Sequence, residues 1–233
     1  MKIFLDSANI EQIKTAYDMG AITGVTTNPS IISRENRKFD DLLTDITAIM
    51  TDGPVFAEVL SVDAEGMIEE GRKLAAKSKN IVVKIPMIPE GLKAVKTLSS
   101  EGITVCNTVV FSSCQAILAA NAGASYVAPF VGRMDDIGEN GLNLVAEIRE
   151  IFDAQGIDTK IVAASVRHPV HVAELARMGT DIATMPFRLL CRWLPTPTPP
   201  EPLKASSRTG KRFLNNQSTK IKRGLTASPL FCL

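Results

Sequence analysis

Short apolar runs recur eight times in the first 190 residues of this 233-residue chain, and a stretch with helical periodicity follows each run. Strands that are almost wholly apolar and alternate with helices are typical of a parallel sheet covered by helices on both faces. The expected strands are Ile3–Leu5, Gly24–Thr26, Val55–Ala57, Ile81–Val83, Ile103–Val105, Tyr126–Ala128, Ile161–Ala163 and Ile182–Thr184. The expected helices are Ile10–Met19, Phe39–Met50, Ala64–Ala76, Glu90–Leu98, Ser112–Ala120, Leu142–Phe152, Val170–Met178 and Pro186–Leu194.

Eight strand–helix units in one chain of this length predict closure into a single (β/α)8 barrel, the α/β fold called the TIM barrel. The alternative is an open, doubly wound sheet. Its first strand–helix turn usually carries a glycine-rich phosphate-binding pattern, which Asp6-Ser7-Ala8-Asn9 lacks. The barrel is therefore the preferred prediction.

Residues 191–233 differ from the rest of the chain. Five prolines between 195 and 202 exclude a helix there. From Cys191 onward there are eight Lys or Arg residues and one acidic residue, whereas residues 1–190 carry 18 basic and 24 acidic side chains. We expect a barrel domain over 1–190 with an incomplete last helix, and an atypical, irregular or disordered tail over 191–233.

The overall charge and the cysteines limit the possible partners. A formal net charge of +1 predicts neither a nucleic-acid partner nor a membrane partner, and no apolar run approaches the length of a membrane span. The four cysteines show no CxxC spacing, which favours a reducing compartment and a cytoplasmic protein without a metal site. For His168 and His171, packing or capping at a helix start is the preferred interpretation over metal binding.

Catalytic groups of such barrels project from the carboxyl ends of the strands. The polar residues that close or follow the apolar runs are therefore the candidates for one shared site. In chain order they are Asp6, Thr26, Asn28, Glu58, Lys84, Thr108, Arg133, Ser165 and Arg167.

Lys84 closes the run Ile81–Val83 and precedes Ile85-Pro86. Apolar surroundings disfavour the charged form of an amine and leave more of the neutral nucleophile, which imine formation with a ketone requires. The alternative is a lysine at a strand end whose amine reaches solvent.

Asp6 and Glu58 are candidates for acid–base work, because cleaving a carbon–carbon bond next to an imine requires removal of a hydroxyl proton. Two carboxylates in different environments can divide such roles. The alternatives are a helix cap for Asp6 and a structural salt bridge for Glu58.

Arg133 and Arg167 follow the sixth and seventh runs, and Ser165 lies beside the second arginine. Phosphate sites in these barrels often lie around the late strands, and a guanidinium group matches phosphate oxygens. A phosphate site therefore competes with the simpler interpretation of two surface arginines.

Several segments in the correct order resemble the transaldolase family, in particular its small-subunit branch, which includes fructose-6-phosphate aldolases. The likeness extends from Met1 to about Leu190. The segments that carry it are Gly24-Val25-Thr26-Thr27-Asn28-Pro29-Ser30, Val82-Val83-Lys84-Ile85-Pro86, Glu90-Gly91-Leu92, Ala128-Pro129-Phe130-Val131-Gly132-Arg133 and Ala163-Ala164-Ser165-Val166-Arg167.

The resemblance implies a cofactor-free mechanism in which Lys84 forms a Schiff base with a ketose and Asp6 moves the proton of the C4 hydroxyl. Glu58 and Thr108 would handle a catalytic water, Thr26 and Asn28 would position the substrate, and Arg133, Ser165 and Arg167 would hold its phosphate. The implied reaction belongs to the pentose phosphate pathway. It converts sedoheptulose 7-phosphate and glyceraldehyde 3-phosphate into erythrose 4-phosphate and fructose 6-phosphate.

Two positions distinguish transferases from aldolases in this family. The aldolases have glutamine in place of Glu58 and tyrosine in place of Phe130. A phenol can donate a proton and help to release free dihydroxyacetone, whereas Phe130 cannot, so transaldolase is the preferred prediction. The alternatives are an aldolase that releases dihydroxyacetone and an inactive barrel that serves as a binding protein.

The chain also departs from the family. Asn107 stands one position later than the family's asparagine, and because one residue reverses the face of a strand, Asn107 is not a predicted site residue. The family implies a homo-oligomer supported by a helical C-terminus. Residues 191–233 do not resemble that helix, so the oligomeric state stays open.

Overall fold

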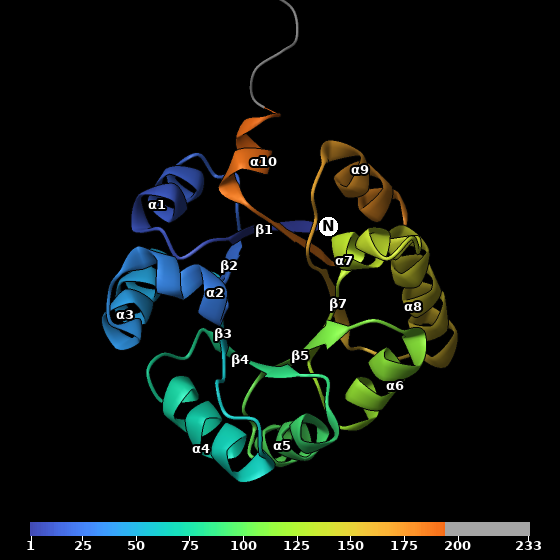
Figure 1. Cartoon of the computed structure of the whole chain (residues 1–233), viewed down its shortest axis with the longest axis horizontal. Coiled ribbons are helices and arrows are strands. Elements are labelled where there is room, and N and C mark those ends of the chain that lie inside the picture. Colours follow the sequence, from blue (N-terminus) through green and yellow to red (C-terminus); the bar gives the residue numbers. More distant parts are fainter. Residues whose placement is uncertain (194–233) are drawn as a thin grey trace, which may run out of the picture. The chain divides into compact units, whose positions relative to one another are not determined.

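The computed structural model describes residues 1–193, which form a closed barrel of eight parallel strands surrounded by helices (Figure 1). The strands are β1 (Lys2–Asp6), β2 (Gly24–Thr26), β3 (Val55–Glu58), β4 (Ile81–Pro86), β5 (Val105–Val110), β6 (Tyr126–Pro129), β7 (Lys160–Ala163) and β8 (Ile182–Met185). Each strand pairs with the next, and β1 pairs with β8 to close the barrel. The predicted (β/α)8 barrel is confirmed, and the open-sheet alternative is wrong.

The fifth strand was predicted too early in the chain. It begins at Val105 and extends to Val110, whereas the sequence pattern indicated Ile103–Val105. The polar residues Asn107 and Thr108 looked like the end of a run, yet both are buried within the strand. In a strand covered on both faces, a polar residue can be buried on either side, so polarity is a poor marker of its end.

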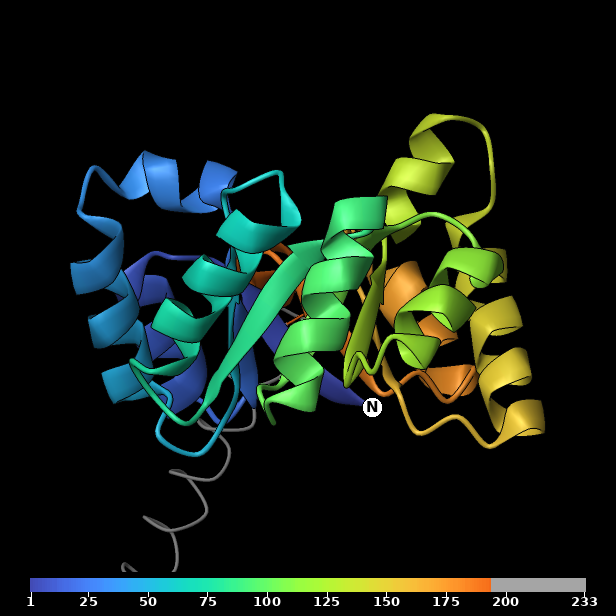
Figure 2. The ribbon, with the colours of Figure 1, turned by 90° about the horizontal axis from the view of Figure 1, so that it is seen from below.

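The helices that cover the barrel are α1 (Ile10–Asp18), α3 (Phe39–Ile49), α4 (Ala64–Ala75), α5 (Pro89–Ser100), α6 (Ser113–Asn121), α8 (Gly141–Gln155), α9 (Pro169–Arg177) and α10 (Phe187–Cys191). They correspond to the eight expected helices. Three further short helices were not predicted, because so few residues show little periodicity: α2 (Pro29–Ile32), the 3-10 helix η1 (Ser33–Glu35) and α7 (Val131–Asp136). Figure 2 shows α2 and α7 extending beyond the same end of the barrel.

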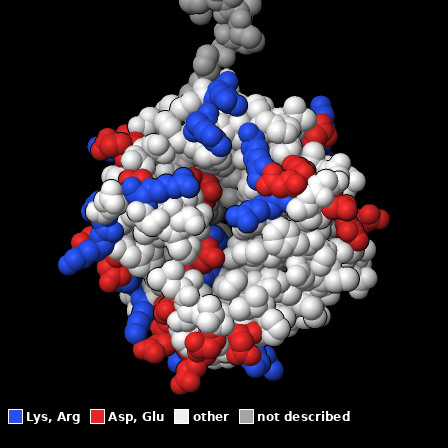
Figure 3. Space-filling model, viewed as in Figure 1, with Lys and Arg blue, Asp and Glu red and all other residues white. Residues whose placement is uncertain are grey.

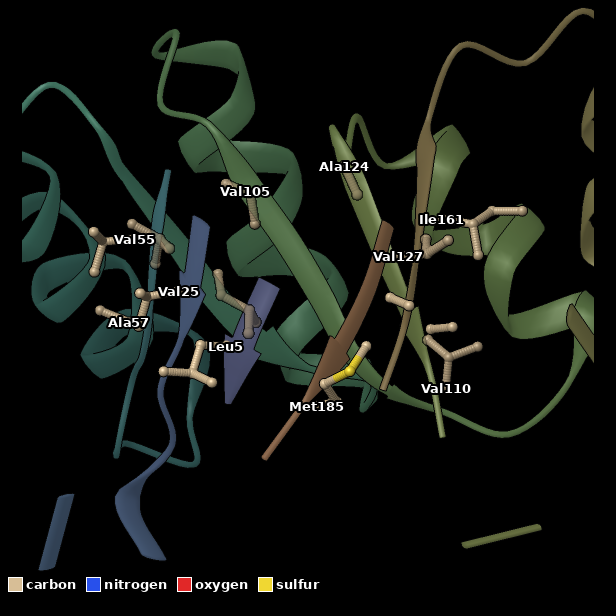
Figure 4. Packing of buried hydrophobic residues seen from close by; sticks show 14 of the residues in the cluster. Leu5, Val25, Val55, Ala57, Val105, Val110, Ala124, Val127, Ile161 and Met185 are labelled. Atoms are coloured by element: carbon tan, nitrogen blue, oxygen red, sulfur yellow. The ribbon is translucent and has the colours of Figure 1, made fainter. Parts of the chain in front are cut away.

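Side chains alternate between two apolar layers. Even-numbered residues such as Phe4, Phe56 and Val82 fill the inside of the barrel with Cys106, Ala128, Val162 and Ile182. Odd-numbered neighbours such as Leu5 and Val25 pack between the strands and the helices in a second, larger cluster (Figure 4). Because the side-chain period of a strand is two, the polar residues at even positions near the strand ends face the barrel interior.

The start of α5 lies unusually close to the end of β4. A Cβ atom on Gly91 would lie 2.1 Å from the carbonyl oxygen of Pro86. Only glycine permits that approach without displacing the backbone. Gly91 therefore allows α5 to pack against the end of the strand that carries Lys84.

The described part of the chain ends shortly after α10, which stops at Cys191. The predictions for the tail beyond Trp193 therefore lie outside the described residues. Within residues 1–193, no helix is both long enough and apolar enough to span a membrane.

Candidate active site

A pocket of about 160 Å³ opens among the carboxyl ends of the strands. Figure 3 shows the hollow near the middle of the face, with basic and acidic side chains around it. All the predicted site residues except Glu58 and Arg167 line it. The lining comprises Asp6, Thr26, Asn28, Phe56, Lys84, Cys106, Thr108, Ala128, Phe130, Arg133, Val162, Ala164, Ser165 and Thr184.

Lys84 projects from β4 into this pocket and is only 7% exposed. Its Nζ donates a hydrogen bond to the carbonyl oxygen of Thr27 at 2.9 Å and another to Oε2 of Glu58 at 3.0 Å. The amine is therefore held inside the barrel mouth by two fixed acceptors. The alternative, in which the amine reaches solvent, is wrong.

Glu58 stands beside Lys84 because β3 and β4 pair in a register that places the two residues opposite each other. Their side chains form an ion pair and are 17% and 9% exposed. Glu58 also borders a second hollow, outside the central pocket, together with Phe39 and Leu60. Its carboxylate thus contacts the Lys84 amine without lining the central pocket.

Asp6 is the second carboxylate of the pocket. Burial raises the pKa of its carboxyl group, while the charge of Lys84 and a 2.8 Å hydrogen bond from the Thr26 hydroxyl oppose that rise. The suggestion that Asp6 caps α1 is wrong, because Oδ1 of Asn9 accepts the Gln12 amide at 3.1 Å and supplies that cap. Asp6 is left free to act in the pocket.

Thr108 and Asn28 place further polar groups in the pocket. Oγ1 of Thr108 is buried and has no hydrogen-bond partner among residues 1–193, so it is available to a water or a substrate. Asn28 caps α2, and its Oδ1 accepts the Ile31 amide at 3.0 Å. Its amide nitrogen is the group left for a ligand. Asn107 instead donates to the carbonyl of Ile85 and does not line the pocket, in agreement with the strand-face argument.

Backbone strain occurs at two places around the pocket. Val109, next to Thr108, has a φ of 64° where the pairing of β5 with β6 shifts register, and Ser165 has a φ of 59°. A positive φ is rare for any residue except glycine, and a β-branched residue there is a genuine outlier. Such strain tends to persist at functional sites, and here it accompanies the placement of Thr108 and Ser165.

The opposite side of the pocket carries Phe130, Arg133 and Ser165. The Arg133 guanidinium carbon lies 5.8 Å from the centre of the Phe130 ring, so the ring supports one face of the cation.

Arg167 does not line this pocket. Both of its terminal nitrogens donate to Asp136 at the end of α7. That bidentate pair holds the pKa of Asp136 below its usual range, with a smaller contribution from Arg133. Asp135 also acts on the charge of Arg167, so two arginines and two carboxylates lie near one another at this end of the site.

The His168–His171 pair is a packing element. The two rings lie 3.7 Å apart at the start of α9, and Nε2 of His171 is 3.3 Å from Asp135. Burial is the main reason why the pKa of His171 is lowered. Within residues 1–193, no group of three or more His, Cys, Asp or Glu side chains has the geometry of a metal site.

Two residues of the pocket that carry a hydroxyl or a thiol were missed from the sequence. Thr184 closes the run Ile182–Thr184 just as the predicted site residues close theirs, so the same criterion identifies it once it is applied to the last strand. Cys106 lies opposite Lys84 in the register of β4 and β5, and burial raises the pKa of its thiol to about 12. Its only sequence signal is an even-numbered position in β5.

Comparisons with known proteins identify the family and several relatives. Residues 3–226 match the family model described as Transaldolase/Fructose-6-phosphate aldolase. A protein of Agathobacter rectalis named "Probable transaldolase" is 58% identical over 192 residues, which are 82% of this chain and 88% of that protein. A protein of the same name from Desulfitobacterium hafniense is 57% identical over 192 residues, or 82% of this chain and 90% of its own length.

One solved structure, titled "Native KDPGal structure", matches with a TM-score of 0.55 and 15% identity over 78% of this chain and 80% of that chain. At that level of identity the likeness concerns the barrel fold alone.

The raised pKa of Asp6 predicts a pH-dependent effect on stability. A carboxyl group whose pKa is higher in the folded than in the unfolded state weakens the fold as the pH rises and the group ionises. Asp6→Asn should therefore be more stable than the parent at about pH 7, and this advantage should shrink as the pH falls towards about 4, near the ordinary aspartate pKa.

Denaturant unfolding across this pH range measures the difference. Asp158→Asn, which removes an exposed aspartate, is the control and should stay close to the parent. An Asp6→Asn protein that is less stable than the parent at neutral pH would contradict the interpretation.

Proposed function

The chain belongs to the transaldolase/fructose-6-phosphate aldolase family, and we propose that it is a transaldolase acting through a Schiff base on Lys84. It transfers a dihydroxyacetone unit from a ketose phosphate to an aldose phosphate. The proposed reaction is that of the pentose phosphate pathway, from sedoheptulose 7-phosphate and glyceraldehyde 3-phosphate to erythrose 4-phosphate and fructose 6-phosphate. We further propose that the enzyme works in the cytoplasm.

The observation that carries the proposal is a buried amine held by Glu58 inside a pocket that also contains Asp6. The amine of Lys84 adds to the C2 carbonyl of the ketose, and loss of one water gives the imine. The nitrogen gives up a proton before it attacks, and Glu58, 3.0 Å away, is placed to accept it.

Asp6 acts in the bond-breaking step. It accepts the proton of the C4 hydroxyl, the C3–C4 bond breaks, and its electron pair moves into the protonated imine to give an enamine on Lys84. The fragment from C4 onward leaves as an aldehyde. A carboxyl group whose pKa burial has raised is a better proton acceptor than an exposed one, and it can return that proton in the reverse direction.

Glu58 and Thr108 handle water in the proposed mechanism. The buried hydroxyl of Thr108, which has no partner among residues 1–193, can hold the water that leaves on imine formation and returns on hydrolysis. Thr26 and Asn28 line the same wall as Asp6 and are proposed to orient the sugar hydroxyls. This chemistry needs no cofactor, because the protonated imine itself accepts the electron pair.

Arg133 and Ser165 are proposed to bind the substrate phosphate with charge-assisted hydrogen bonds. Arg167 belongs to the same proposal, although its guanidinium pairs with Asp136. Because this pair is exposed, a phosphate dianion can reach Arg167 and compete with Asp136 for it. A homo-oligomeric enzyme is expected from the family, and its substrates are the only other partners that we propose.

Transfer is favoured over release because Phe130 borders the pocket and has no proton to donate. The enamine then waits for a second aldehyde. An aldolase that releases dihydroxyacetone is the alternative, and its signature is cleavage of fructose 6-phosphate without any acceptor.

Replacement of Lys84 by methionine should abolish the transfer of the three-carbon unit from fructose 6-phosphate to erythrose 4-phosphate. We expect the rate to fall at least about 10³-fold, since no covalent intermediate can form. Quantification of sedoheptulose 7-phosphate measures transfer, and quantification of dihydroxyacetone released without the acceptor tests the aldolase alternative. The exposed Lys96→Met is the matched control and should keep the parent rate. Parent-like transfer by Lys84→Met would refute the proposal.

Arg133→Gln should weaken the use of phosphorylated donors selectively. Loss of charged hydrogen bonds worth about 1.5–3 kcal/mol is expected to raise KM for fructose 6-phosphate by about 10- to 100-fold. The kinetic constants for unphosphorylated fructose should change little. Arg177→Gln, which removes an exposed arginine in the last turn of α9, is the control. An equal rise in KM with both sugars would show that Arg133 does not bind the phosphate.

A further inference from the structure

Thr184 ends a short chain of hydrogen-bonded side chains that leads to Asp6. Its Oγ1 lies 2.6 Å from Oγ1 of Thr26, and the Thr26 hydroxyl lies 2.8 Å from Oδ1 of Asp6. Thr184 and Thr26 are each 3% exposed, and all three residues line the pocket. The three residues come from β8, β2 and β1. This series of hydrogen bonds therefore spans the junction of β8 with β1, where the barrel closes.

The number of hydrogens on each side-chain oxygen determines which group donates in each of these hydrogen bonds. A threonine hydroxyl carries one hydrogen, and an ionised carboxylate carries none. Thr26 donates its single hydrogen to Asp6, so the short contact between the two threonines requires Thr184 to donate to Thr26. Thr184 then faces the pocket with lone pairs only.

A hydroxyl that accepts a hydrogen bond becomes a stronger donor, because neighbouring bonds in a chain polarise one another. Donation from Thr184 therefore strengthens the bond from Thr26 to Asp6. That bond and the charge of Lys84 oppose the effects of burial and of the nearby Glu58 carboxylate on Asp6. Thr184 thus acts on the charge of Asp6 through Thr26 rather than by direct contact.

We propose that Thr184 is a positioning residue which aims the Thr26 hydrogen at Asp6 and so keeps Asp6 ionised and ready to accept a proton. The source of that proton, a substrate hydroxyl, rests on the proposed function, whereas the effect of Thr184 on Asp6 does not.

Thr184→Val, which keeps the shape of the side chain and removes its hydroxyl, tests the proposal kinetically. We expect the acidic limb of the kcat–pH profile to move to higher pH, so that kcat falls by up to about tenfold at a pH on that limb and little above it, because Asp6 loses support for its charge. Thr184→Ser should restore both. Thr180→Val removes another buried threonine hydroxyl, one without a partner in residues 1–193, and should behave like the parent.

A titration that needs no substrate separates this inference from the proposed function. Carboxyl ¹³C NMR of the aspartate-labelled protein, with Asp6 assigned from Asp6→Asn, should give a higher Asp6 pKa in Thr184→Val than in the parent. If the parent lacks transferase activity and the Asp6 pKa is still higher in Thr184→Val than in the parent, the proposed function is wrong and the inference about Thr184 stands.

An unchanged Asp6 titration together with parent-like kinetics would overturn the role of Thr184. If Thr184→Val does not fold, the kcat–pH profile and the Asp6 titration are measured on Thr184→Ala instead, which removes the hydroxyl without adding apolar volume.

Discussion

The ion pair between Lys84 and Glu58 is the interaction on which the pocket depends. A charge removed from water is costly unless an opposite charge and fixed hydrogen bonds replace the solvent, and Glu58 and the Thr27 carbonyl supply both. One amine faces two carboxylates, so Glu58 pairs with Lys84 directly while Asp6 remains free for proton transfer. A protonated imine on Lys84 carries its positive charge at the same place, so the pair with Glu58 can form again once Glu58 has passed on the proton that it accepts in the proposed mechanism.

The barrel places this pair through a simple alternation. The even-numbered strand residues named above face the barrel interior. The apolar ones form a layer, and the polar ones near the carboxyl ends of the strands line the pocket above that layer. In that layer the ring of Phe56 packs edge-on against Phe4 and Tyr126, with ring centres 5.6 and 5.1 Å away. This layer closes the floor of the pocket to water, which strengthens the electrostatic interactions above it. The strained backbone at Val109 and Ser165 occurs only above this layer, at the strand ends.

The barrel and most of the candidate site were predictable because the strand pattern is periodic and each polar side chain follows an apolar run. Lys84, Asp6 and Thr108 could be placed in one pocket from that regularity alone. Partners that come from distant segments could not be predicted. The pairing of Arg167 with Asp136 and the contact of Thr184 with Thr26 depend on how segments that are distant in the sequence meet in space. The buried polar residues of β5 likewise misled the assignment of its end.

Reductive trapping tests the central claim most directly. The protein is incubated with fructose 6-phosphate, reduced with borohydride and mapped by peptide mass spectrometry. The account predicts one added sugar fragment, located on the peptide that contains Lys84 and absent from Lys84→Met. A stable adduct at another lysine, or none on a folded protein, would contradict it.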